Sequence, residues 1–198
     1  KLGLEFFDTY GPDGIRNLQK LKIPIFLDLK IHDIPQTVKK TIDTLSSLKP
    51  DILNVHALGG KKMMQYALES LSNNSPYTQL VAVTILTSLD NDDLQMMKID
   101  ISTKDLVSSL ARLTKESGLS GVVCSSEEIK LVREACGKNF KIIVPGIRPE
   151  GSDKNDQKRI MTPKEAISLG ADHLVIGRPI TESKDPRKTA KEIVNSIR

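Results

Sequence analysis

Short runs of β-branched and aliphatic residues alternate with longer amphipathic stretches along the whole chain. Most of the short runs are continuously apolar, as in LVAVTIL from Leu80, rather than alternating between apolar and polar positions. This pattern is typical of parallel strands with helices on one face and a packed interior on the other. We predict seven strands, at roughly residues 1–6, 23–29, 51–56, 80–86, 121–124, 141–145 and 172–176.

The stretches between these strands have helical periodicity and recognisable helix ends. One apolar face, with spacings of four and three, consists of Val38, Ile42, Leu45 and Leu48. Capping-box patterns predict helix starts at Thr162–Glu165 and at Ser125–Glu128. Gly118 and Gly170 lie where two helices should end.

Strict alternation of strands and helices leaves two α/β architectures, an open doubly wound sheet or a (β/α)8 TIM barrel. We predict the barrel, as a single domain over residues 1–198, because the GxGxxG turn expected of a Rossmann-type sheet is absent. The sequence begins inside a predicted strand, at Lys1, with no preceding loop. We therefore expect the first barrel strand to be missing from this sequence and the domain to be incomplete at its N-terminus.

Composition places the chain among globular proteins, with 38% apolar and 27% charged residues in a length of 198. No apolar run approaches the ~18 residues of a membrane span, and the N-terminus lacks a signal-peptide pattern, so we expect a cytoplasmic protein without a membrane partner. The formal net charge of +4 favours small anions. With 4% aromatic residues and no tryptophan, the chain offers few platforms for stacking bases, and we expect no nucleic-acid partner.

The two cysteines and three histidines are scattered. Cys124 and Cys136 form no CxxC pair, and no two histidines have the spacing of a helical zinc site. We expect buried thiols and no transition-metal site.

The most informative stretch is IFLDLKIHDIPQT, from Ile25 to Thr37. Side chains alternate along a strand, so Asp28 and Lys30 should share one face, and Asp33 in the following loop can curl back toward them. Two carboxylates favour the protonated form of the ammonium, which is unsuited to Schiff-base chemistry but suited to stabilising a negative charge and supplying a proton. A solvated ion pair at a strand end is the plain alternative.

The segment DLKIHDIP resembles the DxKxxD signature of the orotidine 5′-phosphate decarboxylase family. Further motifs in the order of that family extend the resemblance over nearly the whole chain. They are KLGLEFF with Gly11 and Pro12, NVHALGG from Asn54, VTILTS from Val83, GVVCS from Gly121, PGIRPEG from Pro145, NDQKRIMTP from Asn155 and IGRPI from Ile176.

This resemblance implies cofactor-free decarboxylation of orotidine 5′-monophosphate to uridine 5′-monophosphate, with no pyridoxal, thiamine, flavin or metal. It makes Lys30 the proton donor to C6 of the pyrimidine and places Asp28 beside the substrate carboxylate. Lys1 completes an alternating Lys-Asp-Lys-Asp array. It also implies a homodimer in which Asp33 reaches the site of the partner subunit.

Substrate-binding residues are expected in several loops. Barrels commonly hold a phosphate in the loops after strands seven and eight, where Arg148, Gly177 and Arg178 lie. The resemblance adds Gln157 at the phosphate, Thr87 at the pyrimidine, and the segment Ile34, Pro35, Gln36 and Thr37. The residues alone also fit surface arginines and an ordinary hydroxyl at a strand end.

Three further expectations concern other segments. The polar loop over residues 146–160 has the length of a lid that closes over the phosphate. His32 is expected to make a structural hydrogen bond rather than to act in catalysis. The family's ribose-contacting aspartate belongs to the strand before Lys1, so this chain made alone should have little or no activity.

Two other functions fit parts of the sequence. A magnesium-dependent sugar-phosphate decarboxylase or aldolase of the same barrel superfamily would keep DxKxxD, although the HDIP, LTS and DQKR motifs favour a nucleotide. A non-catalytic anion or nucleic-acid binder would show steeply salt-dependent affinity and indifference to Lys30.

Overall fold

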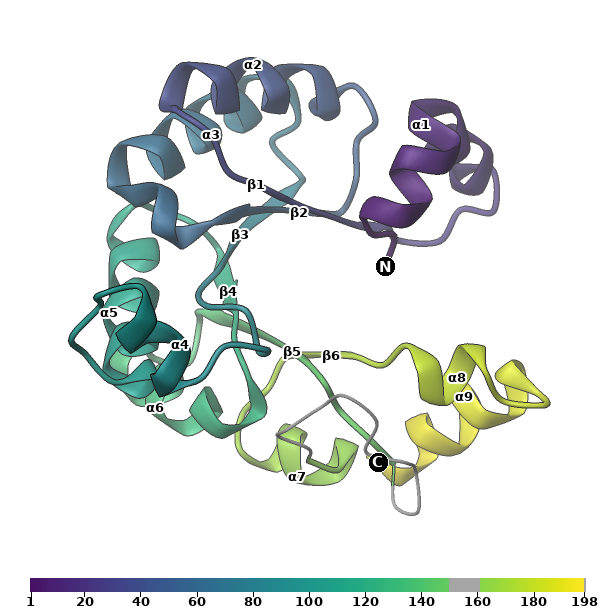
Figure 1. Cartoon of the computed structure of the whole chain (residues 1–198). Helices are drawn as coiled ribbons and strands as arrows, with labels where there is room; N and C mark the ends of the chain where they lie inside the picture. The colour runs from purple at the N-terminus through teal and green to yellow at the C-terminus, as the bar shows by residue number, and fades with distance from the viewer. Residues whose placement is uncertain (150–160, 198) are drawn as a thin grey trace. The chain divides into compact units, whose positions relative to one another are not determined.

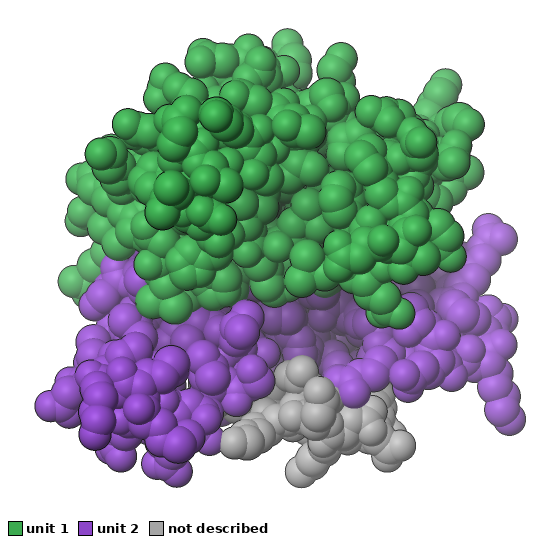
Figure 2. All heavy atoms as spheres, turned by 45° about the horizontal axis from the view of Figure 1, so that its top comes forward, with its two compact units in different colours: residues 1–84, 112–121 green, residues 85–111, 122–198 purple. Residues whose placement is uncertain are grey.

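The computed structural model describes residues 1–149 and 161–197. The chain divides into two compact units, shown in different colours in Figure 2. Unit 1 comprises residues 1–84 and 112–121, and unit 2 comprises residues 85–111 and 122–198.

Unit 1 is built on three parallel strands (Figure 1). Its β2 and β3 pair in regular register from Ile52 opposite Gln79 to His56 opposite Val83. The helices α2 and α3 pack against each other, and the buried face of α2 includes Val38 and Ile42. The elements wholly within this unit are α1 (Leu4–Gln19), β1 (Phe26–Ile31), α2 (Pro35–Ser46), β2 (Ile52–His56), η1 (Ala57–Gly59), α3 (Gly60–Asn74) and β3 (Gln79–Val83).

Unit 2 contains a parallel pair of strands, β5 and β6, with Ile143 opposite His173. The backbone N–H of Cys124, just after β4, donates to the carbonyl of Ile143 at 3.2 Å. The elements of the rest of the chain, of which α5 and β4 are divided between the units, are α4 (Asn91–Met96), α5 (Thr103–Glu116), β4 (Gly121–Val123), η2 (Ser126–Glu128), α6 (Ile129–Cys136), β5 (Lys141–Pro145), α7 (Pro163–Ser168), β6 (His173–Val175), α8 (Arg178–Thr181) and α9 (Pro186–Ser196).

The strands follow one another in the order β1-β2-β3-β4-β5-β6, which is their order in the chain. Sequential parallel strands joined by helices are the predicted α/β arrangement. Within the described residues, no helix is long and apolar enough to cross a membrane.

The prediction of a strand over residues 1–6 is wrong except at Leu2. Leu2 forms an isolated parallel bridge to Leu27, and α1 begins two residues later, at Leu4. The apolar run also has helical spacing, since the rings of Phe6 and Tyr10, one helical turn apart, lie 5.0 Å apart between centroids. The apolar run alone therefore could not separate strand from helix.

The other predicted strands are present, β5 with the predicted bounds and the rest with shifted ends. The largest shifts are in β1, expected at 23–29, and in β3, which ends at Val83 instead of residue 86. Thr84 and Ile85 continue the buried run beyond the last residue of β3. An apolar pattern reports burial, and here burial extends past the end of the strand.

Most of the predicted helix ends are confirmed. Both expected capping boxes form, at Thr162 with Glu165 and at Ser125 with Glu128. Gly118 and Gly170 follow the ends of α5 and α7 with φ of +89° and +107°. This left-handed region favours glycine because it has no Cβ.

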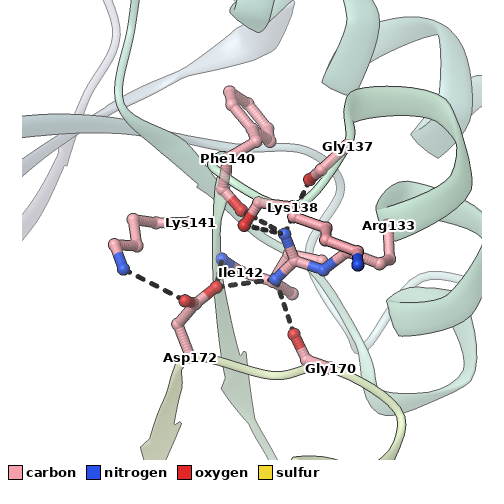
Figure 3. Close-up of polar contacts among 8 residues, drawn as sticks. All are labelled: Arg133, Gly137, Lys138, Phe140, Lys141, Ile142, Gly170 and Asp172. Atoms are coloured by element: carbon pink, nitrogen blue, oxygen red, sulfur yellow. Dashed lines mark hydrogen bonds and ion pairs between the residues drawn. The ribbon is translucent and has the colours of Figure 1, made fainter.

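Arg133 ties together two connections of unit 2 (Figure 3). Its Nη2 donates to the carbonyl of Gly170 at 2.6 Å and to Oδ2 of Asp172 at 2.7 Å. Its Nη1 donates to three carbonyls of the loop between α6 and β5, at 2.7, 3.0 and 2.7 Å, those of Gly137, Lys138 and Phe140. The guanidinium is thus almost fully engaged by protein acceptors.

Asp172 is the acidic partner in this group, and it directly precedes β6. It accepts from the backbone N–H of Ile142 at 2.9 Å and from Nζ of Lys141 at 3.1 Å, both at the start of β5 (Figure 3). We call Arg133, Lys141 and Asp172 the Asp172 cluster. Its position at the amino ends of β5 and β6 is the end where barrel folds concentrate stabilising contacts.

Candidate active site

Four polar side chains meet at β1 and β2 in unit 1. Oδ2 of Asp28 accepts from Nζ of Lys1 at 2.6 Å, and Oδ1 accepts from Nζ of Lys30 at 2.8 Å and from Nδ2 of Asn54 at 2.7 Å. We call Lys1, Asp28, Lys30 and Asn54 the Asp28 cluster. The structure thus brings together the predicted Lys1, Asp28 and Lys30.

The backbone at Lys30 departs from a regular strand. β1 advances from Leu27 to Ile31 while its partner advances only from Leu53 to Val55, so β1 is bulged between these pairs. Lys30 lies in the bulge with φ of +48°. Simple alternation therefore predicted the contact between Lys30 and Asp28 correctly but did not predict the bulge that presents the lysine.

The carboxylate of Asp28 is buried yet ionised. Burial raises its pKa, but hydrogen bonds from Lys1, Lys30 and Asn54 outweigh that effect and hold the pKa below its ordinary value. Among the described residues, Asp28 is the one hydrogen-bond acceptor for each of the two ammonium groups. An ammonium has three donors, so each lysine keeps donors for a ligand.

Two histidines adjoin the cluster. The imidazoles of His32 and His56 are stacked, with centroids 5.4 Å apart. The hydrogen bond expected of His32 is not seen among the described residues. Burial lowers the pKa of His56, and the neighbouring His32 and Lys30 lower it further, so this imidazole is neutral at pH 7. Its buried Nδ1 has no hydrogen-bond partner among the described residues.

Asp33 and the segment after it form an exposed edge of unit 1. Oδ1 of Asp33 accepts from the backbone N–H of Ile34 at 2.6 Å. In the part of the chain that the structure describes, Asp33 has no ion pair with Lys30, so it does not join the Asp28 cluster through a direct contact. Ile34 caps α2 and Pro35 is its first residue, which leaves Gln36 and Thr37 exposed in the first turn.

Arg148 follows β5 in unit 2 and is buried, with 6% exposure. Its Nη1 donates to the carbonyl of Ile147 at 3.1 Å, and its Nε has no partner among the described residues. The alternative of a surface arginine is therefore wrong for this residue. A buried guanidinium with an unused donor is suited to an anionic ligand.

The other predicted binding residues in unit 2 lie in loops or at helix starts. Gly177 precedes α8, and the half-buried Arg178 is its first residue. Thr87 is half-buried in a turn after β3. Gln157 and residues 150–160 of the expected lid lie outside the described residues.

The cysteines are buried and free, as predicted. Burial raises the pKa of the Cys124 thiol far above its ordinary value, and nearby Glu128 raises it further. A protonated, inaccessible thiol is a packing residue rather than a nucleophile.

Sequence reasoning missed Asn54 as a member of the site. The signal was present, because Asn54 is a polar residue inside the otherwise apolar run ILNV. A fully buried amide requires hydrogen-bond partners, and here they are site residues.

Comparison with known proteins gives consistent results. A family model described as "Orotidine 5'-phosphate decarboxylase / HUMPS family" matches residues 1–193. A solved orotidine 5′-phosphate decarboxylase from Lactobacillus acidophilus is 37% identical, with a TM-score of 0.88 over 99% of this chain and 85% of that one. An uncharacterised conserved protein from Geobacillus kaustophilus is 36% identical, with a TM-score of 0.87 over 99% of this chain and 86% of that one.

These likenesses confirm the predicted α/β fold of the TIM-barrel type. The family match covers nearly the whole chain and includes both the Asp28 cluster and Arg148. The chain therefore belongs to the orotidine 5′-phosphate decarboxylase / HUMPS family.

Proposed function

We propose that the protein decarboxylates orotidine 5′-monophosphate to uridine 5′-monophosphate without a cofactor. The observation that carries this proposal is the Asp28 cluster, in which one buried carboxylate binds two ammonium groups. Membership of the family and the likeness to a decarboxylase at 37% identity support the choice of substrate.

The chemistry requires an external positive charge. When the bond between C6 and the carboxylate breaks, CO₂ leaves and the electron pair stays at C6 in an orbital in the ring plane, where the π system cannot absorb it. The ammonium of Lys30 stabilises this pair electrostatically and then transfers a proton from Nζ to C6. The resulting neutral amine regains a proton from solvent, which closes the cycle.

Asp28 acts in two ways in this proposal. Its ionised carboxylate, 2.8 Å from Nζ of Lys30, fixes the position of the ammonium before the substrate arrives. It also lies beside the substrate carboxylate, and repulsion between the two anions is relieved when CO₂ departs. Lys1, 2.6 Å from the other carboxylate oxygen, supplies a second positive charge.

Binding of the nucleotide uses residues remote from C6. Arg148 offers the unused Nε, and Arg178 and Gly177 offer further donors for the 5′-phosphate, together with Gln157. Thr87 contacts the pyrimidine, and the exposed first turn of α2 continues the binding segment. Binding energy from the phosphate aligns the ring and raises kcat.

The direct test is a spectrophotometric assay of orotidine 5′-monophosphate decarboxylation by the purified protein and by Lys30→Ala, with and without a chelator. We expect turnover that the chelator does not change and that the variant loses. Turnover abolished by the chelator would contradict decarboxylation without a cofactor. Full turnover by Lys30→Ala would contradict the proposed mechanism.

We further propose that the enzyme is a homodimer in which Asp33 enters the partner's site. The support is that Asp33 is exposed and lies in the signature motif without an ion pair among the described residues. Mixing inactive Lys30→Ala and Asp33→Ala chains should then restore part of the activity, because one site of each mixed dimer regains both groups. Confirmed mixed dimers without activity would refute the shared site.

A further inference from the structure

Asn54 occupies an unusual place for a polar residue. It lies in the middle of β2, and its exposure is 0%. Its neighbours in the strand, Leu53 and Val55, are equally buried and apolar. A buried amide at such a position must have all of its main hydrogen bonds satisfied by the protein.

Two hydrogen bonds fix the orientation of this amide. Oδ1 of Asn54 accepts from the backbone N–H of Lys30 at 2.8 Å, and Nδ2 donates to Oδ1 of Asp28 at 2.7 Å. A backbone N–H can only donate, and an ionised carboxylate can only accept. The amide therefore has one orientation that satisfies both neighbours.

The first of these bonds supports an unfavourable backbone conformation. Lys30 has φ of +48°, a region that side chains with a Cβ rarely adopt. Its backbone N–H lies in the bulge and bonds to Asn54 instead of a strand carbonyl. Such a conformation persists only where the surroundings hold it in place.

The second bond fixes the partner of the ammonium. Oδ1 of Asp28 receives both Nδ2 of Asn54 and Nζ of Lys30. Asn54 thus holds the lysine at its backbone and also holds the carboxylate that binds the end of its side chain. One amide therefore holds Lys30 at its backbone and, through Asp28, at the ammonium end of its side chain.

We propose that Asn54 is a positioning residue for the decarboxylation, acting through Lys30 and Asp28 without touching the substrate. This inference rests on the proposed function, since it assigns Asn54 to the same reaction. It predicts that changes at Asn54 reduce kcat and leave KM for the nucleotide nearly unchanged, because the phosphate contacts are elsewhere in the chain.

Asn54→Ala removes both bonds and is the first variant to measure. We expect kcat to fall by about 100-fold, as for other small displacements of a catalytic group, with KM within about threefold of the wild-type value. The matched control is Asn74→Ala. Asn74 is another asparagine of unit 1 whose Nδ2 donates to an aspartate, Asp43, at 2.9 Å, but on the surface. The control should keep wild-type kcat and KM.

Asn54→Asp tests the chemistry of the amide and not only its volume. Its carboxyl group retains an acceptor for the N–H of Lys30 but, when ionised, repels Asp28. A proton shared by the two carboxyl groups restores the donor, so kcat relative to the wild type should rise as the pH falls from about 8 to about 5. A purely structural role would not create this pH dependence.

The outcomes separate this inference from the proposed function. If the wild type decarboxylates the nucleotide and Lys30→Ala does not, while folded Asn54→Ala keeps wild-type kcat, only the role of Asn54 is refuted. If the wild type shows no decarboxylation, the proposed function itself fails. Should Asn54→Ala not fold, Asn54→Asp decides, and a pH profile parallel to that of the wild type would overturn the inference.

Discussion

The Asp28 and Asp172 clusters are both centred on an aspartate, but their basic side chains make different further contacts. Each has a carboxylate bound to two basic side chains, and in each case hydrogen bonds overcome burial and lower the pKa of the aspartate. In the Asp172 cluster, Arg133 also donates hydrogen bonds to four backbone carbonyls (Figure 3). In the Asp28 cluster, the ammonium groups bind the carboxylate alone among the described residues.

This difference separates a structural ion pair from one suited to catalysis. Arg133, whose donors are almost all satisfied by the protein, holds loops together, whereas the ammonium groups of the Asp28 cluster keep donors for a substrate. Lys141 also bonds only to the carboxylate among the described residues, but it lies at the amino end of β5. Position agrees with this assignment, since Asp172 precedes β6 while Lys30 lies near the carboxyl end of β1. Barrel enzymes place their chemistry at the carboxyl ends of strands and stabilising contacts at the amino ends.

The largest expected effect comes from exchanging one lysine of each cluster, Lys30 or Lys141, for arginine. Lys30→Arg keeps a positive charge beside Asp28 but replaces the proton donor with a guanidinium that does not release its proton, so decarboxylation should fall by about 10³-fold. Lys141→Arg should leave kcat and KM unchanged, because Lys141 lies at the amino end of β5 and keeps a charged partner for Asp172 as arginine. Steady-state kinetics of both variants tests this prediction. A wild-type kcat for Lys30→Arg would show that Lys30 does not donate the proton.

A smaller effect, on stability, is expected from the other cluster. Arg133→Ala leaves Asp172 with one basic partner and removes donors from four carbonyls, and we expect the free energy of unfolding to fall by about 3 kcal/mol. The activity of the folded fraction should not change. Urea unfolding and active-site titration measure the two quantities, and a loss of specific activity without a loss of stability would contradict the structural assignment.

Acid should reduce the stability that both aspartates contribute. A folded-state pKa below the unfolded value means that the carboxylate contributes stability above the unfolded pKa of about 3.9, and that this contribution is lost as the pH falls through the folded pKa. Asp172→Asn removes one such group. Its urea midpoint should therefore decline less than that of the wild type between about pH 5 and pH 3, and an equal decline would show that Asp172 does not contribute.

The smallest effect is expected at the exposed edge of the Asp172 cluster. The Lys141 side chain is 41% exposed, so solvent screens its ion pair, and Lys141→Ala should change the free energy of unfolding by less than about 1 kcal/mol. Urea unfolding beside Arg133→Ala makes the comparison. A loss as large as that of the arginine variant would mean that the two basic residues act as one unit.

The order of strands and helices could be predicted because it depends on burial, which the apolar pattern records. The same pattern failed at residues 1–6, where Leu2 pairs with Leu27 but a helix follows at once, since the run satisfies both periodicities. The contact of Lys30 with Asp28 followed from strand alternation. The bulge at Lys30 did not, because the backbone N–H of Lys30 there donates to Asn54, a side chain of the neighbouring strand β2.

The same limit explains Arg133. In the sequence it is one of many basic residues on an amphipathic helix, and nothing local distinguishes it. Its importance comes from its contacts with distant loops, including the one that holds Asp172. Only the folded chain shows these contacts. The contacts of Lys1 and Lys30 with Asp28 were thus predicted from a motif, whereas the tertiary contacts of Asn54 and Arg133 were not.

In the proposed reaction, the ammonium of Lys30 exchanges a proton with C6 of the pyrimidine. The reverse of that step can be measured alone, by following the replacement of the C6 hydrogen of uridine 5′-monophosphate with deuterium in heavy water by proton NMR. We expect exchange catalysed by the wild type and none above background with Lys30→Ala. Exchange at the wild-type rate by the variant would contradict the account.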